Sequence, residues 1–334
     1  MRTSPLLRRY ASALAITVTC AQLTVPTGAV AQDAIRGAFP DRPIRLIVPY
    51  PPGGPSDVMG RLISQSLSGT LGQQVYVDNR PGAGSTLGGK LAAAADPDGY
   101  TLLLATAATL AIGPALYPDA GLDPSVFVPV AMFSSAPFVM IAGPKTALNS
   151  VAEVIAFAKA QPGKLTLGVP SGAPPHMLAG WFKSLTATDI LVVPYKGAAS
   201  GITEIIGGQI DLGIEPTSVV LSHLGDGTMR PLATTTPERI AEIPQVPTMM
   251  ESGIPGFIAS SWTGIMAPPG TAQAIIDKIN GALNAGLRTT ELQTKLKALG
   301  AEGAPGTTAE FASFIATEVP KWTAMAKLSG ADPQ

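Results

Sequence analysis

The chain contains few of the side chains that catalytic and metal sites use. It has one cysteine, Cys20, and two histidines, His176 and His223. Neither histidine stands in an H-E-x-x-H motif, and neither Ser85 nor Ser171 has the flanking glycines of a G-x-S-x-G elbow. We therefore expect no catalytic residue, no metal site, no cofactor and no enzymatic activity.

Charged residues are also scarce, at 13% of the chain, about half the usual share. The 22 Lys and Arg residues nearly balance the 23 Asp and Glu residues, and no basic stripe is visible, so nucleic acid is not an expected partner. Beyond the N-terminal segment, no apolar run reaches membrane-spanning length without Gly, Pro or a charge.

Residues 1–31 have the pattern of a cleavable export signal. Arg2, Arg8 and Arg9 precede an apolar stretch, and residues 29–31 (AVA) fit a small-x-small cleavage site. Cleavage would remove Cys20, which would exclude disulfides, cysteine nucleophiles and thiolate metal sites from the mature chain. We expect a periplasmic protein whose mature chain begins at residue 32.

The rest of the chain alternates short apolar runs with helical patterns, which is typical of a mostly parallel α/β sheet. Its length favours two domains over one core. The expected strands are residues 44–48, 75–77, 100–105, 133–142, 165–169, 190–194, 209–214 and 262–267. The expected helices cover residues 58–67, 86–95, 150–159, 176–185, 198–206, 271–287 and a last segment opened by a capping box at Thr307 and Glu310.

The stretch 44–71 carries the main functional signal. An apolar strand ends at a proline- and glycine-rich turn, and Ser56 or Asp57 can cap the helix that follows. The first amides of a helix have no partner within it, and the helix dipole places partial positive charge there. Gly53 and Gly54 have no Cβ, so a ligand oxygen could approach the backbone. This turn is therefore a candidate binding site for a small organic anion.

Three further loops follow a strand and precede a helix, as this turn does. In open α/β sheets ligands bind beyond the carboxyl ends of the strands, so the four loops could converge on one cleft between two domains. The candidate ligand-binding residues are Pro52, Gly53, Gly54, Ser56, Asp57, Thr106, Ala107, Ala108, Thr109, Ser171, Gly172, Ala173, His176, Tyr195, Lys196, Gly197 and Glu215.

Several of these residues allow two interpretations. Lys196 is either the positive group for an anion or a solvated surface lysine. Glu215 follows an expected strand end and is either a cleft residue or a solvated charge. His176, at a helix start, more simply makes a local hydrogen bond than contacts the ligand. Asp57 and Glu215 could pair as acid and base, but Asp57 as a helix cap is the simpler interpretation.

The glycine-rich segment 82–90 (GAGSTLGGK) imitates nucleotide-binding motifs without matching them. Leu91 stands where a P-loop has Ser or Thr for magnesium, and the glycine spacing is one position off G-x-G-x-x-G. We expect these glycines to serve tight turning and close helix packing.

Seven short motifs occur in order along the chain and together resemble one known family. They are residues 49–57 (PYPPGGPSD), 79–84 (NRPGAG), 97–100 (PDGY), 194–197 (PYKG), 207–212 (GGQIDL), 246–248 (VPT) and 267–271 (APPGT). The chain is similar to the Bug-type periplasmic substrate-binding receptors of the tripartite tricarboxylate transporter system. The resemblance covers essentially the whole mature chain.

The resemblance implies a two-lobed periplasmic-binding-protein fold of type II, with two doubly wound α/β domains joined by two crossing strands. These strands would lie near residues 133–140 and 260–266, so domain I would be residues 32–135 and 258–334, and domain II residues 136–257. It also implies a ligand carboxylate held by loop backbone, hydroxyl groups and water rather than by an arginine, which agrees with the absence of Arg from the four loops. The first turn, Thr106 with Thr109, the 171–176 loop and the 195–197 loop carry over as the site.

This chain departs from the family pattern where hydroxyl and imidazole groups are common. Ala107, Ala108 and Leu110 replace Ser, Gly and His, and residues 173–175 (APP) replace hydroxyl residues. A ligand with many oxygens would leave some of them unpaired on burial. We therefore expect a monocarboxylate with an apolar or aromatic body.

The function that follows is a monomeric solute receptor that delivers its acid to the membrane subunits of a tripartite tricarboxylate-type transporter. Two alternatives remain open at this point. The protein could be an orphan sensor that presents the acid to a membrane sensor kinase, or an exported hydrolase.

Overall fold

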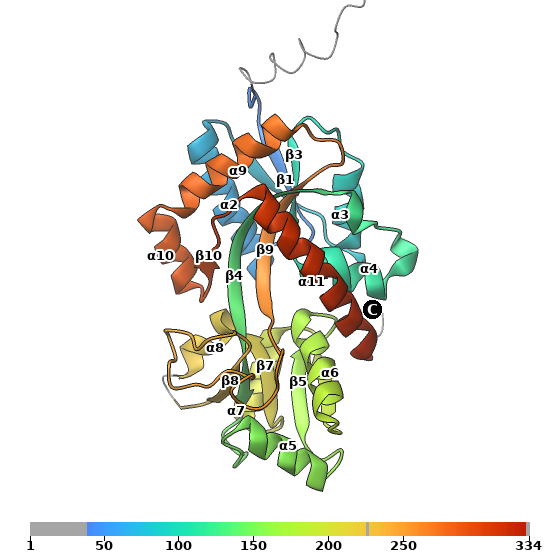
Figure 1. Ribbon diagram of the computed structural model, residues 1–334, viewed down its shortest axis with the longest axis vertical. Helices are drawn as coiled ribbons and strands as arrows, with labels where there is room; N and C mark the ends of the chain where they lie inside the picture. Colours follow the sequence, from blue (N-terminus) through green and yellow to red (C-terminus); the bar gives the residue numbers. More distant parts are fainter. Residues whose placement is uncertain (1–38, 225–226, 332–334) are drawn as a thin grey trace, which may run out of the picture. The chain divides into compact units, whose positions relative to one another are not determined.

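The computed structural model describes residues 39–224 and 227–331. The expected export signal, residues 1–31, lies outside this part of the chain. Within residues 39–334, which form one compact unit, helices and strands alternate through most of the chain (Figure 1). No helix in the described part combines the length and the apolarity that crossing a bilayer requires.

The described strands form one ten-stranded sheet in the order β2-β1-β3-β9-β4-β7-β5-β6, with β8 and β10 also paired to β4. Their bounds are β1 Ile44–Val48, β2 Val75–Asn79, β3 Thr101–Ala105, β4 Val128–Ala142, β5 Thr166–Pro170, β6 Leu191–Tyr195, β7 Leu212–Pro216, β8 Arg230–Thr234, β9 Ser260–Ala267 and β10 Glu302–Gly303.

Two groups of three parallel strands lie at opposite ends of this order. In the first, β1 pairs with β2 and β3; in the second, β5 pairs with β6 and β7. The expectation of a parallel sheet is correct for these six strands. The middle of the sheet is antiparallel, because β4 pairs antiparallel with β7, β8, β9 and β10. The inner strands β1, β3, β5 and β7 are mostly buried, whereas the edge strands β2 and β6 are partly exposed.

β4 and β9 connect the two groups (Figure 1). They pair antiparallel from Val128 opposite Ala267 to Pro137 opposite Ser260, with two irregularities in register. β4 then continues to Ala142 beside β7 and β8. Both strands therefore lie where the sequence predicts the crossing strands, although β4 begins earlier than residue 133.

Three buried clusters fill the space between the helices and the sheet. One packs α2 and α9 on the first strand group, and another packs α7 and α8 on one face of the second group. The third extends along α6 and α11 to both groups.

The helices are α2 Pro55–Leu71, α3 Thr86–Ala93, α4 Gly113–Leu116, α5 Val151–Ala160, α6 Pro174–Thr186, α7 Ala198–Gly207, α8 Thr217–Leu224, α9 Gln273–Leu287, α10 Thr290–Ala298 and α11 Thr308–Leu328. Shorter turns are η1 Ala83–Ser85, the π-helical η2 Ala108–Ile112, η3 Pro118–Ala120 and η4 Pro124–Val126.

The capping residues define several of these helix starts. The capping box at Thr307 and Glu310 opens α11 as the sequence predicts. At α5 the Ser150 side chain accepts from the Glu153 amide, but the Glu153 carboxylate binds the amide of Asn149 rather than that of Ser150. The box expected there is therefore only half formed.

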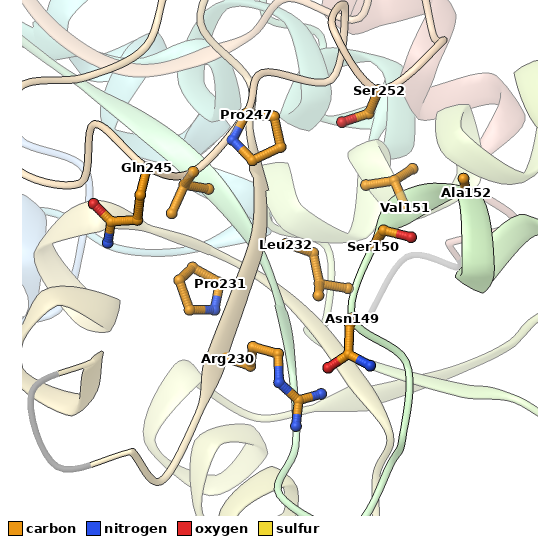
Figure 2. Close-up of a pocket in the computed structure, with 11 residues that line it drawn as sticks. Asn149, Ser150, Val151, Ala152, Arg230, Pro231, Leu232, Gln245, Pro247 and Ser252 are labelled. Carbon is orange, nitrogen blue, oxygen red and sulfur yellow. The ribbon is translucent and has the colours of Figure 1, made fainter.

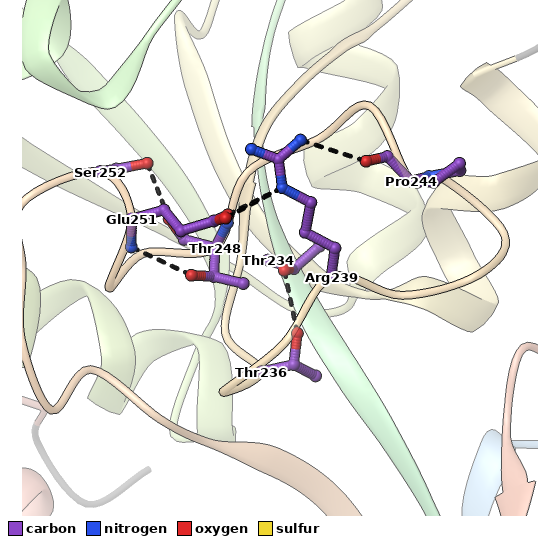
Figure 3. A network of polar contacts seen from close by, with 7 residues as sticks. All are labelled: Thr234, Thr236, Arg239, Pro244, Thr248, Glu251 and Ser252. Carbon is purple, nitrogen blue, oxygen red and sulfur yellow. Dashed lines mark hydrogen bonds and ion pairs between the residues drawn. The ribbon is translucent and has the colours of Figure 1, made fainter.

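The long connection between β8 and β9 is fixed by a polar network (Figure 3). Thr248 and Glu251 exchange hydrogen bonds, since each side chain accepts from the other residue's amide, at 2.8 and 3.0 Å. The Arg239 guanidinium adds bonds to the Glu251 carboxylate and to the carbonyl of Pro244. The 246–248 motif therefore has a structural role, because these contacts fix the turn at Thr248.

Candidate functional site

A cavity of about 620 Å³ lies beyond the ends of strands from both groups. Its walls come from the turn after β1, from η1, from the segment between β3 and α4, from the loops after β5 and β6, and from the end of β7 with the first turn of α8. Phe138 of β4 and Trp262 of β9 also line it. This volume fits a small organic molecule.

Nine of the seventeen candidate residues line this cavity, and they represent all four predicted loops. They are Ser56, Thr106, Ala107, Ala108, Ser171, Gly172, Ala173, Lys196 and Glu215. The other eight, which do not line it in this structure, are Pro52, Gly53, Gly54, Asp57, Thr109, His176, Tyr195 and Gly197. The structure thus brings the four loops together, with part of each loop turned away from the cavity.

The first turn is shaped by Asp57 rather than capped by it. Gly54 is the N-cap of α2, and Pro55 takes the first helical position. The buried Asp57 carboxylate accepts from the Gly53 amide at 2.9 Å and from the Asn79 side chain at 3.0 Å, and it pairs with Arg61. Burial by itself would raise the pKa of Asp57, but hydrogen bonds from Arg61, Gly53 and Asn79 outweigh it and hold the pKa below its ordinary value. Asp57 therefore belongs to the support of the turn and not to an acid–base pair.

The start of α6 cannot offer the free amides that the sequence-based interpretation assigned to helix beginnings. Pro174 and Pro175 occupy its first two positions and have no N–H. The remaining amides of the loop are bonded within it or to β6. Gly172 donates to His176 Nδ1, Ala173 to the carbonyl of Pro170, and Ser171 to the carbonyl of Tyr195. The prediction that unpaired helix-start amides bind the ligand is therefore wrong for the loop before α6.

His176 acts within this loop. Its Nδ1 accepts from the Gly172 amide at 3.3 Å, and burial lowers the pKa of His176, so the ring is neutral. This is the local hydrogen bond that the sequence favoured over ligand contact.

Thr106 and Thr109 are tied to a residue absent from the candidate set. The Tyr50 hydroxyl lies 2.6 Å from Thr106 Oγ1 and 3.1 Å from Thr109 Oγ1. Burial raises the pKa of Tyr50, so the hydroxyl stays protonated and available to this network. Thr106 and Tyr50 line the cavity, and Thr109 is fully buried beneath them.

Among the described residues that line the cavity, Lys196 and Glu215 are the only ones that are Lys, Arg, Asp or Glu. Lys196 is exposed at its edge, whereas Tyr195 packs its ring against Gly168 and Gly201. Glu215 lies within β7 rather than after it and is 2% exposed, so it is not a solvated charge. Burial raises the pKa of Glu215 to about 8.

Two residues that line the cavity each have a buried polar side-chain atom without a hydrogen-bond partner among the described residues. In the described part of the chain, only three side-chain polar atoms are both buried and unpaired: Glu215 Oε2, Trp262 Nε1 and Ser66 Oγ. The first two belong to residues that line this cavity. Unpaired buried polar groups are costly, and a bound molecule in the cavity could satisfy them.

The candidate set missed the wall built by η1 and α4 and the residues from β4 and β9. The missed lining residues include Tyr50, Gly82, Ala83, Gly84, Ser85, Ile112, Gly113, Leu116, Tyr117, Phe138 and Trp262. The motif at 79–84 was a signal for the η1 part. The glycines of the 82–90 segment pack closely as expected: a Cβ on Gly88 would lie 2.7 Å from the carbonyl oxygen of Arg80, and one on Gly89 would lie 2.6 Å from Leu122.

A second cavity, of about 400 Å³, lies between the start of α5, strand β8 and the 245–247 segment (Figure 2). Arg230 lines it, but its Nη1 donates to the backbone carbonyls of Thr146 and Leu148. None of the four predicted loops contributes to this cavity. The first cavity is therefore the candidate ligand site.

Comparison with known proteins gives the same answer as the motifs. Residues 59–330 match the model of the tripartite tricarboxylate transporter family receptor. Protein BugT of Bordetella pertussis is 37% identical over 310 residues, which cover 92% of this chain and 95% of BugT. A protein encoded in the ttuE-ttuC' intergenic region of Agrobacterium vitis is 35% identical, covering 83% of this chain and 79% of that protein.

Solved structures confirm the predicted fold class. Periplasmic binding protein BugD superposes with a TM-score of 0.73 at 32% identity, covering 89% of this chain and all of BugD. The R. palustris protein Rpa4515 with adipate gives 0.76 at 32% identity, with 89% and 100% covered. MatC from Rhodopseudomonas palustris with bound malate gives 0.74 at 29% identity, with 86% and 100% covered.

Proposed function

Because the chain belongs to the tripartite tricarboxylate transporter receptor family, we propose that it is an exported receptor that binds a small organic carboxylate in the 620 Å³ cavity. The receptor delivers this acid to the membrane subunits of a tripartite tricarboxylate-type transporter. Receptors of this family are solute-binding proteins, and related proteins hold adipate and malate in their solved structures.

One observation carries the proposal. Two of the three unpaired buried polar side-chain atoms in the described part of the chain belong to residues lining the same cavity, which has a single lysine at its edge. A cavity without a ligand would leave these polar groups buried and unpaired, which lowers the stability of the fold. An acid that enters it brings oxygen atoms for these groups and a charge for Lys196.

The character of the wall supports an acid with one carboxylate and an apolar body. Phe138, Trp262, Ile112 and Leu116 line the cavity, and the two prolines that open α6 remove hydrogen-bond donors. Each additional carboxylate would lose water and find hydroxyl groups but no second cationic side chain among the described lining residues. We therefore propose a monocarboxylate rather than a citrate-like ligand.

We further propose that residues 32–135 and 258–334 form one domain, residues 136–257 the other, and that β4 and β9 act as the hinge. Closure about these strands would bring the loops after β5 and β6 and the end of β7 toward the turn after β1. Delivery to a transporter, rather than to a sensor kinase, is tested by loss of acid uptake in cells that lack this protein.

A panel of acids in a thermal-shift titration tests ligand class. We expect benzoate and isovalerate to raise the melting temperature with saturation, malate and adipate to act weakly, and citrate to have no effect. Benzamide, which has the shape of benzoate without its charge, is the matched control and is expected to have no effect. Stabilisation by citrate alone would contradict the proposal that the ligand is a monocarboxylate. If no acid changes the melting temperature, the proposed receptor function is contradicted.

A further inference from the structure

Glu215 is placed as a recognition group and not as a structural one. It is 2% exposed, its Oε2 has no hydrogen-bond partner, and it forms no ion pair among the described residues. By contrast, the buried carboxylate of Asp57 has three partners. A buried carboxyl without a partner weakens the fold, which points to a partner supplied by a ligand.

The alternation of side chains along β7 shows where the carboxyl group lies. Leu212 and Ile214 belong to the cluster that includes α6, whereas a Cβ on Gly213 would point at Ile205 of α7. Glu215 is two residues beyond Gly213 and therefore faces the side of α7 and α8. Ala198, the first residue of α7, and Lys196 line the same cavity.

The titratable groups around β7 leave Glu215 without a compensating charge. β4 and β5, which flank it, have no titratable side chain. The helices packed on β7 carry His176 and Lys183 on α6, Glu204 on α7 and His223 on α8. None of them forms a hydrogen bond or ion pair with Glu215 in the described chain, and burial alone raises the pKa of Glu215 to about 8.

Two kinds of ligand group could complete this site, and the surroundings favour one. An ammonium group would bind the ionised carboxylate, but Lys196 and the start of α7, the positive end of that helix dipole, line the same cavity and would repel it. A carboxylate is attracted by both of these, and it can accept the O–H of a neutral carboxyl group. The start of α7 adds backbone amides that have no partner within the helix.

We propose that the protonated carboxyl group of Glu215 donates a hydrogen bond to the ligand carboxylate at the start of α7, so that the acid binds only to the protonated receptor. This inference rests on the proposed function, because it names the group that receives the acid in the same cavity. Glu215 is then the specificity-determining residue, which favours carboxylates over amines.

The consequence is a proton-linked affinity. About nine tenths of the receptor carries the Glu215 proton at pH 7 and about one tenth at pH 9, since the pKa is about 8. The apparent affinity for a carboxylate should therefore fall about tenfold between these pH values. At pH 9, binding should take up about 0.9 proton per ligand, because nearly every receptor molecule must gain one.

Isothermal titration calorimetry at pH 7, 8 and 9, in two buffers of different ionisation enthalpy, measures both quantities. The probe is whichever of benzoate, isovalerate, adipate, malate or citrate binds most tightly at pH 7. Glu215→Gln keeps a donor and cannot ionise, so it should bind with little pH dependence and no proton uptake. Glu215→Leu lacks the donor and should bind at least tenfold more weakly at pH 7. Glu204→Gln, on the neighbouring α7, is the matched control and should behave as wild type.

Each possible result supports or contradicts either the role of Glu215 or the proposed receptor function. A wild-type affinity unchanged from pH 7 to 9, proton release on binding, or Glu215→Gln as weak as Glu215→Leu would overturn the role of Glu215 while leaving the receptor intact. If none of the five acids binds at any pH, the proposed function itself fails. Circular dichroism of each variant establishes that it is folded before titration.

Discussion

Removal of the Asp57 carboxylate is expected to destabilise the protein more than its exposed ion pair alone would suggest. The carboxylate is 4% exposed and joins the turn after β1, the end of β2 and the first turns of α2 through Gly53, Asn79 and Arg61. Asp57→Ala leaves the Gly53 amide and one donor of Asn79 without this acceptor. It also loosens a turn in which Gly53 has a φ of +83°.

The magnitude follows from the three contacts. Hydrogen bonds to a charged group contribute about 1.5–3 kcal/mol each, but Arg61 is largely exposed and its ion pair adds less than about 1 kcal/mol. Gly53 and Asn79 can regain water in the variant, which reduces the net loss. We therefore expect the free energy of unfolding to fall by about 2–3 kcal/mol.

Urea denaturation followed by tryptophan fluorescence measures this change, with Glu291→Ala as the matched control. Glu291 also pairs with a cation four residues on, Lys295, at 2.6 Å, but its side chain is 72% exposed. The control should unfold at the wild-type urea concentration. Equal effects of the two substitutions would refute the argument that burial and the two amide contacts make Asp57 different.

Acidification also tests the contribution of the Asp57 carboxylate to stability. The pKa of Asp57 is lowered in the folded protein, so its contribution to stability is present above the unfolded-state value, about 3.9, and is lost as pH falls through the folded-state pKa. The wild type should lose stability over this acid range faster than Asp57→Ala does.

Three further substitutions test other parts of the structure. Gly113→Ala would place a Cβ 2.3 Å from the carbonyl oxygen of Gly84, so we expect a lower melting temperature and weaker acid binding, both absent in Gly281→Ala, whose Cβ would meet nothing within 4 Å. Because the pKa of Glu215 is raised to about 8, the folded wild type holds more protons than the unfolded chain between pH 4.5 and about 8, and its free energy of unfolding should fall as pH rises through this range. Glu215→Gln should remove this fall; the same dependence of the free energy of unfolding on pH in urea melts of both proteins would contradict the argument. Gly54→Val should lower the melting temperature little, since its Cβ would meet only the Pro51 carbonyl oxygen, at 3.8 Å. It should weaken acid binding in calorimetry far more, because the proposed domain closure brings this turn, which does not line the cavity in this structure, onto the ligand; unchanged affinity would remove this turn from the site.

The strand–loop–helix units were accessible to sequence reasoning because each depends on local pattern. Apolar runs, proline and glycine breaks and the 3.6-residue period placed most strands and helices within a few residues of their observed bounds. The four loops were found for the same reason, since each directly follows a strand. The two prolines that open α6 were also visible, and their missing N–H groups could have warned against an amide site there.

The antiparallel course of β4 and β9 was not visible in local pattern, because the pairing of distant strands leaves no periodic trace in either one. The same holds for the cavity wall formed by η1 and α4. Gly84 and Gly113 approach each other only after the chain between them has folded.

Hydrophobic period and short motifs are local properties of the chain, so the fold class, the family and the positions of the four candidate loops could be read from the sequence alone. Which groups of those loops face the cavity, and what surrounds each of them, depends on tertiary contacts. Asp57 and Glu215 are both buried carboxyl groups among the candidate residues, yet three donors hold the pKa of Asp57 below its ordinary value, whereas burial without a partner for Oε2 raises the pKa of Glu215 to about 8. That difference comes from burial and from neighbours distant in sequence, which set the free energy of a charge at each position.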